Sequence, residues 1–220
     1  MRVHVIDERN RHLYVEQLEE HHRLRDQIYI GEKKWRALKS TGGREYDQFD
    51  LPDAIYLLAL ADDGSVAGGT RLLQSTGPTL LSEVFPQLAD VRPFQRGTDI
   101  LEWTRFFVAP RFREERRLCR AGGLVSAAMI EFCLMTGVRL LNAVGETYWM
   151  PRISALGWRP RPLGLPIEHD GWSICVWTIE PSETALRLTL RAYDLDSVEL
   201  VWEQREACRA PAKPDARLLM

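Results

Sequence analysis

Hydrophobic and polar positions alternate with two different periods along the chain, and together they predict an α/β protein. Short apolar or alternating stretches predict strands over residues 2–6, 54–61, 66–73, 99–108, 138–144 and 173–179. Stretches with a helical spacing of apolar residues predict helices over residues 10–30, 79–89, 122–136, 151–156 and 182–192. This order predicts a three-layer α/β/α sandwich around a mixed, mostly antiparallel central sheet.

A polar segment over residues 31–53 interrupts this pattern between the first helix and the next strand. It contains three glycines and ends at Leu51-Pro52-Asp53, and irregular connections of this length are usually functional or disordered. We expect it to be mobile until a substrate binds. Residues 1–202 are expected to form a single domain, because residues 203–220 are charged and contain prolines, a composition typical of a flexible tail.

The composition is that of an ordinary globular protein, and it limits the cellular locations and the classes of binding partner that we expect. Of its 220 residues, 45% are hydrophobic and 27% charged, and the net charge of −2 favours neither nucleic acid nor an anionic membrane. No segment has the apolar core of a signal peptide or the run of roughly 18 apolar residues that a membrane helix needs. The four cysteines lie far apart and form no CxxC pair, which predicts reduced thiols, a cytoplasmic location and no metal site.

Several charged residues stand in apolar surroundings, where a charge is costly unless it is paired. Arg71 lies within the predicted strand 66–73, and Glu102 and Arg105 lie within the strand 99–108. Read one at a time, such residues are often members of a buried ion network without chemistry. A tryptophan or an aspartate in a loop is likewise often only an anchor or a cap.

The charged positions form an ordered set with regular spacing. The set is Arg25-x3-Tyr29-x5-Trp35, then Asp47-x2-Asp50, then Arg71, then Glu102-x-Thr104-Arg105 followed by Phe-Phe-Val. In this order and spacing the chain resembles the LuxI-type acyl-homoserine-lactone synthases over residues 2 to 180, with tyrosine at position 29 where the family has phenylalanine. The predicted strand-to-helix order is also similar to the GNAT-like acetyltransferase scaffold.

The resemblance implies a two-step reaction in which the amine of S-adenosylmethionine takes an acyl group from a thioester, and its carboxylate then closes a lactone and releases methylthioadenosine. No permanently bound cofactor is implied. The resemblance assigns catalysis to Glu102, Thr104 and Arg105, and S-adenosylmethionine binding to Arg25, Tyr29, Trp35, Asp47, Asp50 and Arg71. In this assignment the aspartates hold cationic groups, an arginine holds the carboxylate, and the aromatic rings face the adenine or the sulfonium. Glu102 takes the amine proton as a general base, directly or through water.

The spacing of the catalytic strand adds a geometric prediction. Glu102 and Arg105 are three residues apart, so a regular strand would point them to opposite faces of the sheet. If both serve one site, the strand must contain a bulge, which we expect near Trp103–Thr104. A bulge there would also free a backbone N–H for the thioester carbonyl.

The acyl donor is predicted from Trp103, which stands where relatives that use carrier proteins commonly have a small residue. The stretches 145–152 and 162–166 also look similar to the branch that uses coenzyme A thioesters of branched or aryl acids. The expected acyl pocket consists of Trp103, Phe106, Val144, Tyr148, Trp149 and Met150, which would favour a compact acyl group, although these residues are as often ordinary core.

A cluster of arginines follows the catalytic strand. Arg111, Arg113, Arg117 and Arg120 would bind either the phosphates of coenzyme A or the acidic surface of acyl carrier protein, unless they are simply a solvated surface. An N-acyltransferase acting on another amine, which would keep a clear glycine-rich pyrophosphate loop, and a non-enzymatic binding domain are the competing hypotheses.

Overall fold

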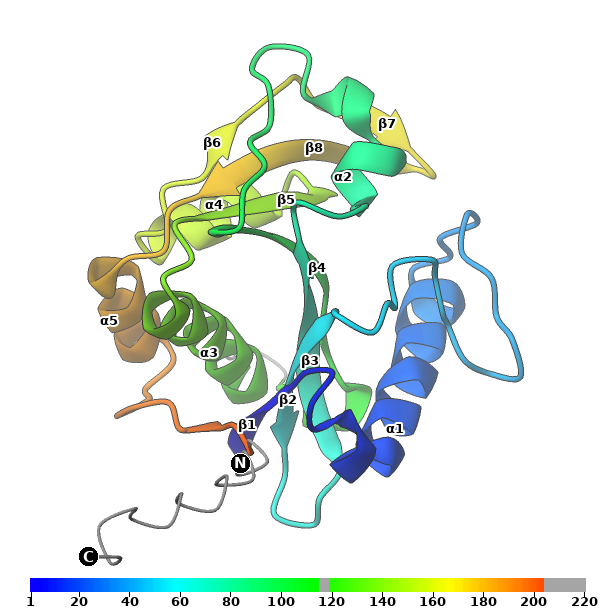
Figure 1. Cartoon of the computed structure of the whole chain (residues 1–220), viewed down its shortest axis with the longest axis vertical. Helices are drawn as coiled ribbons and strands as arrows, with labels where there is room; N and C mark the ends of the chain where they lie inside the picture. The colour runs from blue at the N-terminus through cyan, green and yellow to red at the C-terminus, as the bar shows by residue number, and fades with distance from the viewer. Residues whose placement is uncertain (115–118, 204–220) are drawn as a thin grey trace, which may run out of the picture.

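One mixed sheet forms the middle layer of the protein in the computed structural model, which describes residues 1–114 and 119–203 (Figure 1). The strands lie in the order β6 (Arg161–Pro162), β8 (Trp172–Ile179), β5 (Leu140–Glu146), β4 (Ile100–Val108), β3 (Val66–Gln74), β2 (Ile55–Leu60), β1 (Arg2–Ile6) and β9 (Leu200–Val201). β7 (Ile167–His169) also pairs with β8. Within the described chain, β4–β5 and β1–β9 are parallel and the other neighbours are antiparallel, so the predicted mixed, mostly antiparallel sheet is confirmed.

Helices cover both faces of this sheet. α1 (Val15–Arg25) lies on one face, and α3 (Arg120–Thr136) and α5 (Glu183–Ala192) lie on the other (Figure 1). The short helices α2 (Leu80–Glu83) and α4 (Trp149–Ala155) lie near the ends of β4 and β5. α3 is buried along most of its length and packs against the apolar side chains of the sheet, so it forms the centre of the core. Within the described residues, no helix is long and apolar enough to cross a membrane.

The predicted helix over residues 10–30 is divided into three pieces. A 3-10 turn (η1, Arg11–Leu13) precedes α1, and a π-helical stretch (η2, Asp26–Glu32) follows it. In η2 the hydrogen bonds span five residues rather than four, and the last of them joins Lys33 N to Ile28 O at 2.8 Å. This wider turn has no sequence signature of its own, which is why the spacing predicted one continuous helix.

Most other elements lie within a few residues of their predicted positions, and the exceptions are very short. β6, β7 and β9 have only two or three residues each and were not predicted, because so few residues show no period. The 79–89 segment forms α2 and, after two intervening residues, a short 3-10 helix, η3 (Pro86–Leu88). Another 3-10 helix, η4 (Pro110–Phe112), follows β4. The predicted flexible tail lies outside the described residues beyond Glu203.

Strand β4, which carries the predicted catalytic residues, contains the predicted bulge, but the bulge lies two residues later than expected. Gly69 of β3 faces Phe107, and Arg71 faces Thr104, so Arg105 and Phe106 together oppose a single residue of β3. Arg105 has φ of +53°, a left-handed conformation that is strained for a residue with a side chain. The bulge therefore turns Arg105 and the end of β4 out of the regular alternation of a strand.

β4 and β5 pair over only part of their length. Their parallel ladder runs from Ile100–Leu140 to Trp103–Ala143, and it ends where the bulge begins. Beyond that point the residues of the two strands line a cavity instead of bonding to each other. The fold thus opens its sheet at the place where the sequence concentrates the predicted catalytic residues.

Candidate functional site

Two adjoining cavities lie at the opening between β4 and β5. The first, of about 90 Å³, is lined by Trp103–Phe106 from β4, by residues 143–146 from β5, and by Tyr29, Lys33, Trp35, Leu80, Trp149 and Trp177. The second, of about 230 Å³, extends toward residues 33–54, the segment that connects η2 to β2, and is lined largely by apolar side chains. Both cavities share Trp35, Leu80, Arg105, Val144, Gly145 and Glu146 in their walls. The pair of cavities therefore forms one candidate site with two compartments.

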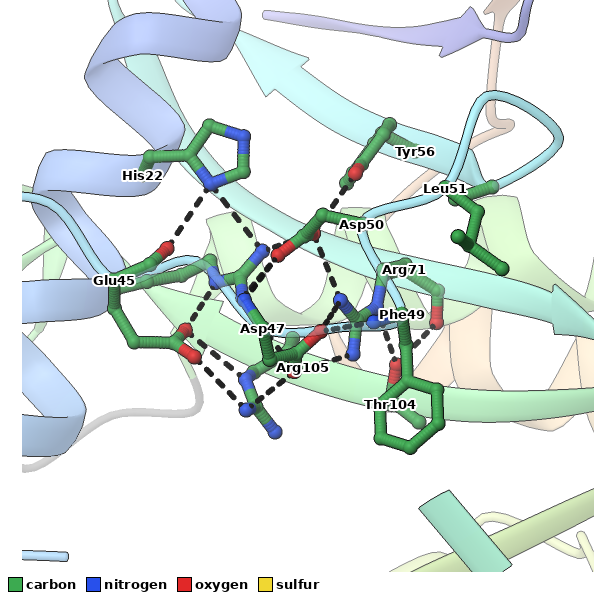
Figure 2. A network of polar contacts seen from close by, with 12 residues as sticks. His22, Glu45, Asp47, Phe49, Asp50, Leu51, Tyr56, Arg71, Thr104 and Arg105 are labelled. Atoms are coloured by element: carbon green, nitrogen blue, oxygen red, sulfur yellow. Dashed lines mark hydrogen bonds and ion pairs between the residues drawn. The ribbon is translucent and has the colours of Figure 1, made fainter. Parts of the chain in front are cut away.

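Beside the second compartment, three arginines and three carboxylates form a closed ion network (Figure 2). The members are Arg25, Arg71, Arg105, Glu45, Asp47 and Asp50. The guanidinium of Arg25 donates to both oxygens of Asp50, at 2.6 and 2.9 Å. Arg71 does the same to Asp47, at 2.6 and 2.9 Å, and also reaches Asp50. These paired hydrogen bonds fasten the 33–54 segment to α1 and β3.

Arg105 and Glu45 complete the network. Arg105 donates to Glu45 at 2.9 and 3.1 Å and to Asp47 at 2.7 Å (Figure 2). Burial by itself would raise the pKa of the Glu45 carboxyl, but the adjacent guanidiniums of Arg105 and Arg25 outweigh it and lower that pKa to about 2. The pKa of Asp50 is likewise held well below its ordinary range by Arg25 and Arg71, against the effect of burial. Glu45 is a network member that the sequence analysis missed, although it lies two residues before Asp47.

The network leaves few of its charged groups facing the cavities. Arg25 and Arg71 are buried, the Asp50 side chain is only 6% exposed, and none of the three lines a cavity. Arg105, by contrast, lines both compartments and Asp47 lines the second. The arginines and aspartates bind each other in this structure, so direct binding of S-adenosylmethionine by Arg25, Asp50 and Arg71 stays a prediction. Thr104 lines the first compartment, and its hydroxyl accepts a hydrogen bond from Arg71 Nε at 3.1 Å.

Glu102 is fully buried on β4 and does not line either cavity as the structure has them. Its carboxylate accepts the backbone N–H of Leu81, at 3.1 and 3.2 Å, in the first turn of α2. Burial raises the pKa of Glu102 to about 7, against the lowering effect of its hydrogen bonds. A carboxyl group with a pKa near neutrality suits a general base. Leu81, the hydrogen-bond partner of Glu102, follows Leu80, which lines both compartments.

Aromatic side chains form much of the remaining wall. Tyr29 and Trp35 stack with ring centroids 4.8 Å apart, and the Tyr29 hydroxyl donates to the carbonyl of Phe106 at 2.8 Å. The hydroxyl that distinguishes Tyr29 from the family's phenylalanine therefore has a partner, and that partner lies in the bulge. Phe106 meets Trp103 and Trp149 edge to face, at 5.8 and 5.4 Å.

The structure divides the predicted acyl pocket. Trp103, Phe106, Val144 and Trp149 line the first compartment. Tyr148 and Met150 are not in the walls of either compartment, and Met150 Sδ instead contacts Cys175 Sγ at 3.5 Å. Four of the six predicted wall residues are thus brought together by β4, β5 and α4.

The predicted arginine cluster is dispersed over the surface in the described residues. Arg113 pairs with Glu32 at 2.7 Å, Arg111 lies 3.6 Å from Asp63, and Arg120 donates to a backbone carbonyl. Arg117 lies outside the described residues. Binding of an anionic carrier by this cluster stays a prediction.

Comparisons with known proteins agree with this geometry. A model of the autoinducer synthase family matches residues 9–184. The isovaleryl-homoserine lactone synthase of Bradyrhizobium diazoefficiens is 42% identical over 173 residues, which cover 78% of this chain and 77% of that protein. The solved structure of BjaI, a CoA-dependent acyl-homoserine lactone synthase with SAM and isopentyl-CoA, is 36% identical and superposes with a TM-score of 0.85 over 92% of this chain and 93% of that one. An acyl-CoA N-acyltransferase from Pseudomonas aeruginosa, 12% identical with a TM-score of 0.57 over 81% of this chain and 99% of that one, shows a shared fold alone.

Proposed function

The chain belongs to the autoinducer synthase family and is an acyl-homoserine-lactone synthase, and we propose that it acylates S-adenosylmethionine from the coenzyme A thioester of a compact, branched or aryl acid. The observation that carries this proposal is the small aromatic compartment between β4 and β5. Trp103, Phe106 and Trp149 close it, so that a short acyl chain fits and a long flexible one exceeds its volume. The second compartment, beside the 33–54 segment, is assigned to S-adenosylmethionine.

Two bond exchanges make up the proposed reaction. In the first, the amine nitrogen of S-adenosylmethionine attacks the thioester carbonyl, an amide bond forms, and the thiolate of the carrier leaves. In the second, the carboxylate oxygen attacks the carbon next to the sulfonium, the lactone closes, and methylthioadenosine leaves as a neutral thioether. The protein must take one proton from the amine and must hold the carboxylate close to its target carbon.

We assign the proton transfer to Glu102. Its pKa of about 7 leaves a large fraction ionised at neutral pH. Because Glu102 does not line the cavities, the proton reaches it through a water molecule at the first turn of α2, beside Leu81. Arg105 lines both compartments and is assigned to the donor carboxylate, while Arg25 and Arg71 hold the 33–54 segment in place behind it.

The preference for coenzyme A over acyl carrier protein is supported by BjaI, a CoA-dependent synthase whose structure contains isopentyl-CoA. The name of the isovaleryl-homoserine lactone synthase supports a short, branched acyl group. The exposed arginines Arg111, Arg113 and Arg120 are suited to the phosphates of the carrier but are too dispersed to identify it. The free thiols of Cys119, Cys133 and Cys175 support the cytoplasm as the location.

The test incubates the purified chain with S-adenosylmethionine and a panel of straight, branched and aryl acyl groups, each on both coenzyme A and acyl carrier protein. Mass spectrometry detects the lactone and methylthioadenosine. Fastest turnover is expected with a short branched or aryl coenzyme A thioester. Turnover with the carrier-protein thioesters alone would refute the choice of donor, and the absence of both products from every thioester would refute the reaction.

A further inference from the structure

The ammonium group of Lys33 lies in a box of aromatic rings at the junction of the two compartments. Its Nζ is 4.9 Å from the ring centre of Trp35, 5.7 Å from that of Trp172 and 6.0 Å from that of Tyr29. On the remaining side it forms an ion pair with Glu146 at the end of β5. Aromatic faces and a carboxylate around one point are the arrangement by which proteins recognise an organic cation.

The local backbone builds this box from segments far apart in the sequence. The end of the π-helical stretch places Lys33 N on Ile28 O and Trp35 N on Tyr29 O, at 2.8 and 3.0 Å, so Trp35 stacks back onto Tyr29. Trp172 begins β8, and Glu146 ends the neighbouring strand β5. The occupant, by contrast, is a flexible side chain that is 23% exposed, which gives it a route out of the box.

Glu146 is the feature that points to an exchange of cations. Its side chain is only 6% exposed, and its one ion pair within the described part of the chain is with Lys33. A buried carboxylate without a cation is costly, so Lys33 can leave only if another positive group replaces it. Glu146 lines both compartments, so a ligand in either one can reach it.

We propose that this box, made by Glu146 and the rings of Tyr29, Trp35 and Trp172, binds the sulfonium of S-adenosylmethionine, and that Lys33 occupies it whenever the donor is absent. The inference rests on the proposed function and adds the residues that recognise the charge of the donor. A sulfonium carries its charge among carbon atoms and has no N–H to donate, so aromatic faces suit it better than a set of hydrogen-bond acceptors. The amine and the carboxylate of the donor then extend from the box toward Arg105.

The exchange also provides a means of releasing the product. When the lactone closes, the sulfonium becomes the uncharged thioether of methylthioadenosine. The neutral sulfur no longer compensates Glu146, and the ammonium of Lys33 returns to the carboxylate. The box therefore favours the charged substrate over the neutral product, because only the sulfonium can take the place of the Lys33 ammonium beside Glu146.

The test compares two ligands that differ in this charge. S-adenosylmethionine and S-adenosylhomocysteine share the adenosine, the amine and the carboxylate, but the second has a neutral thioether. Their dissociation constants are measured by calorimetry on the full chain for wild type, Glu146→Gln and Lys33→Met. Glu146→Gln is expected to weaken binding of the sulfonium about 10-fold or more and that of the thioether less than about 3-fold. Lys33→Met is expected to increase the preference for the sulfonium, because it removes the competing cation.

Matched controls are the exposed residues Glu168, changed to Gln, and Lys39, changed to Met, which should leave both constants unchanged. An unchanged ratio of the two constants in Glu146→Gln, in a variant that melts like wild type, would overturn the proposal. Should Glu146→Gln fail to fold, the preference in Lys33→Met decides, and a preference equal to or below that of wild type overturns it. If wild type makes no lactone and binds no S-adenosylmethionine, the proposed function and this inference both fall. Lactone synthesis with an unchanged ratio overturns the inference alone.

Discussion

The substitution Glu102→Gln is expected to slow acylation and, at alkaline pH, to stabilise the folded protein. Glutamine keeps an oxygen that accepts the Leu81 N–H but has no proton-accepting charge. The two effects have opposite signs because the burial that prepares Glu102 for proton transfer also makes its ionised form costly in the native state.

The size of the stability effect follows from the pKa. Burial raises the pKa of Glu102 from 4.5 to about 7, and this difference corresponds to a contribution of about 3 kcal/mol at most to the free energy of unfolding. Since the native value lies above the unfolded one, this stability is fully present below pH 4.5 and is lost as the pH rises to about 7. The variant has no such loss. Urea unfolding at pH 5 and pH 8.5 should therefore show a gain in its free energy of unfolding, relative to wild type, at the higher pH only.

The effect on activity is measured as kcat/KM for S-adenosylmethionine over a range of pH, with the thioester at a saturating concentration. Wild-type activity should rise through a pKa near 7, and Glu102→Gln should lose this rise together with about 100-fold or more of the rate. Glu83→Gln, on the exposed side of the same helix α2, is the matched control and should keep both. A Glu102→Gln variant that retains the pH dependence and the turnover of wild type would refute the assignment of the base. An equal stability difference at both pH values would refute the raised pKa.

Three further outcomes are expected. Tyr29→Phe removes the donor to the Phe106 carbonyl and should lower the free energy of unfolding by about 1–3 kcal/mol in urea titrations; no loss would show that this bond does not hold the bulge. Because the pKa of Glu45 is about 2 in the native state, its stabilising effect is present above pH 4.5 and lost as the pH falls from 4.5 toward 2, so Glu45→Gln should flatten acid unfolding over that range, and an unchanged profile would contradict it. Trp103→Leu enlarges the first compartment and should shift the preferred coenzyme A thioester toward longer chains in a competition assay, whereas an unchanged preference would remove Trp103 from the acyl pocket.

The sequence predicted elements and motif members better than it predicted contacts. Long strands such as β4 have a clear period, and the cost of a lone charge in a strand already indicated that Arg71 would be paired. The pairing of Lys33 with Glu146 joins residues 113 positions apart and leaves no local pattern in the sequence. The position of the bulge was also out of reach, because arginine has no preference for the left-handed backbone that Arg105 adopts. Local spacing shows that a strand must bend, whereas the register of the neighbouring strand decides where.

The ion network and the cation box have different tasks because of their charge. The network contains equal numbers of arginines and carboxylates, each already bound to an opposite charge, so it has little net charge with which to select a ligand. Its bonds instead hold the segment that carries Trp35 against the sheet, which keeps one wall of the box in position. Glu146, on the opposite wall, is compensated only by a mobile side chain among the described residues, so a ligand can replace its partner without breaking the fold. Selection by charge therefore requires a weakly held ion pair beside a strongly held network. A substitution in the network should change the affinities for S-adenosylmethionine and for its neutral analogue by the same factor. A substitution in the box should change the ratio of these two affinities.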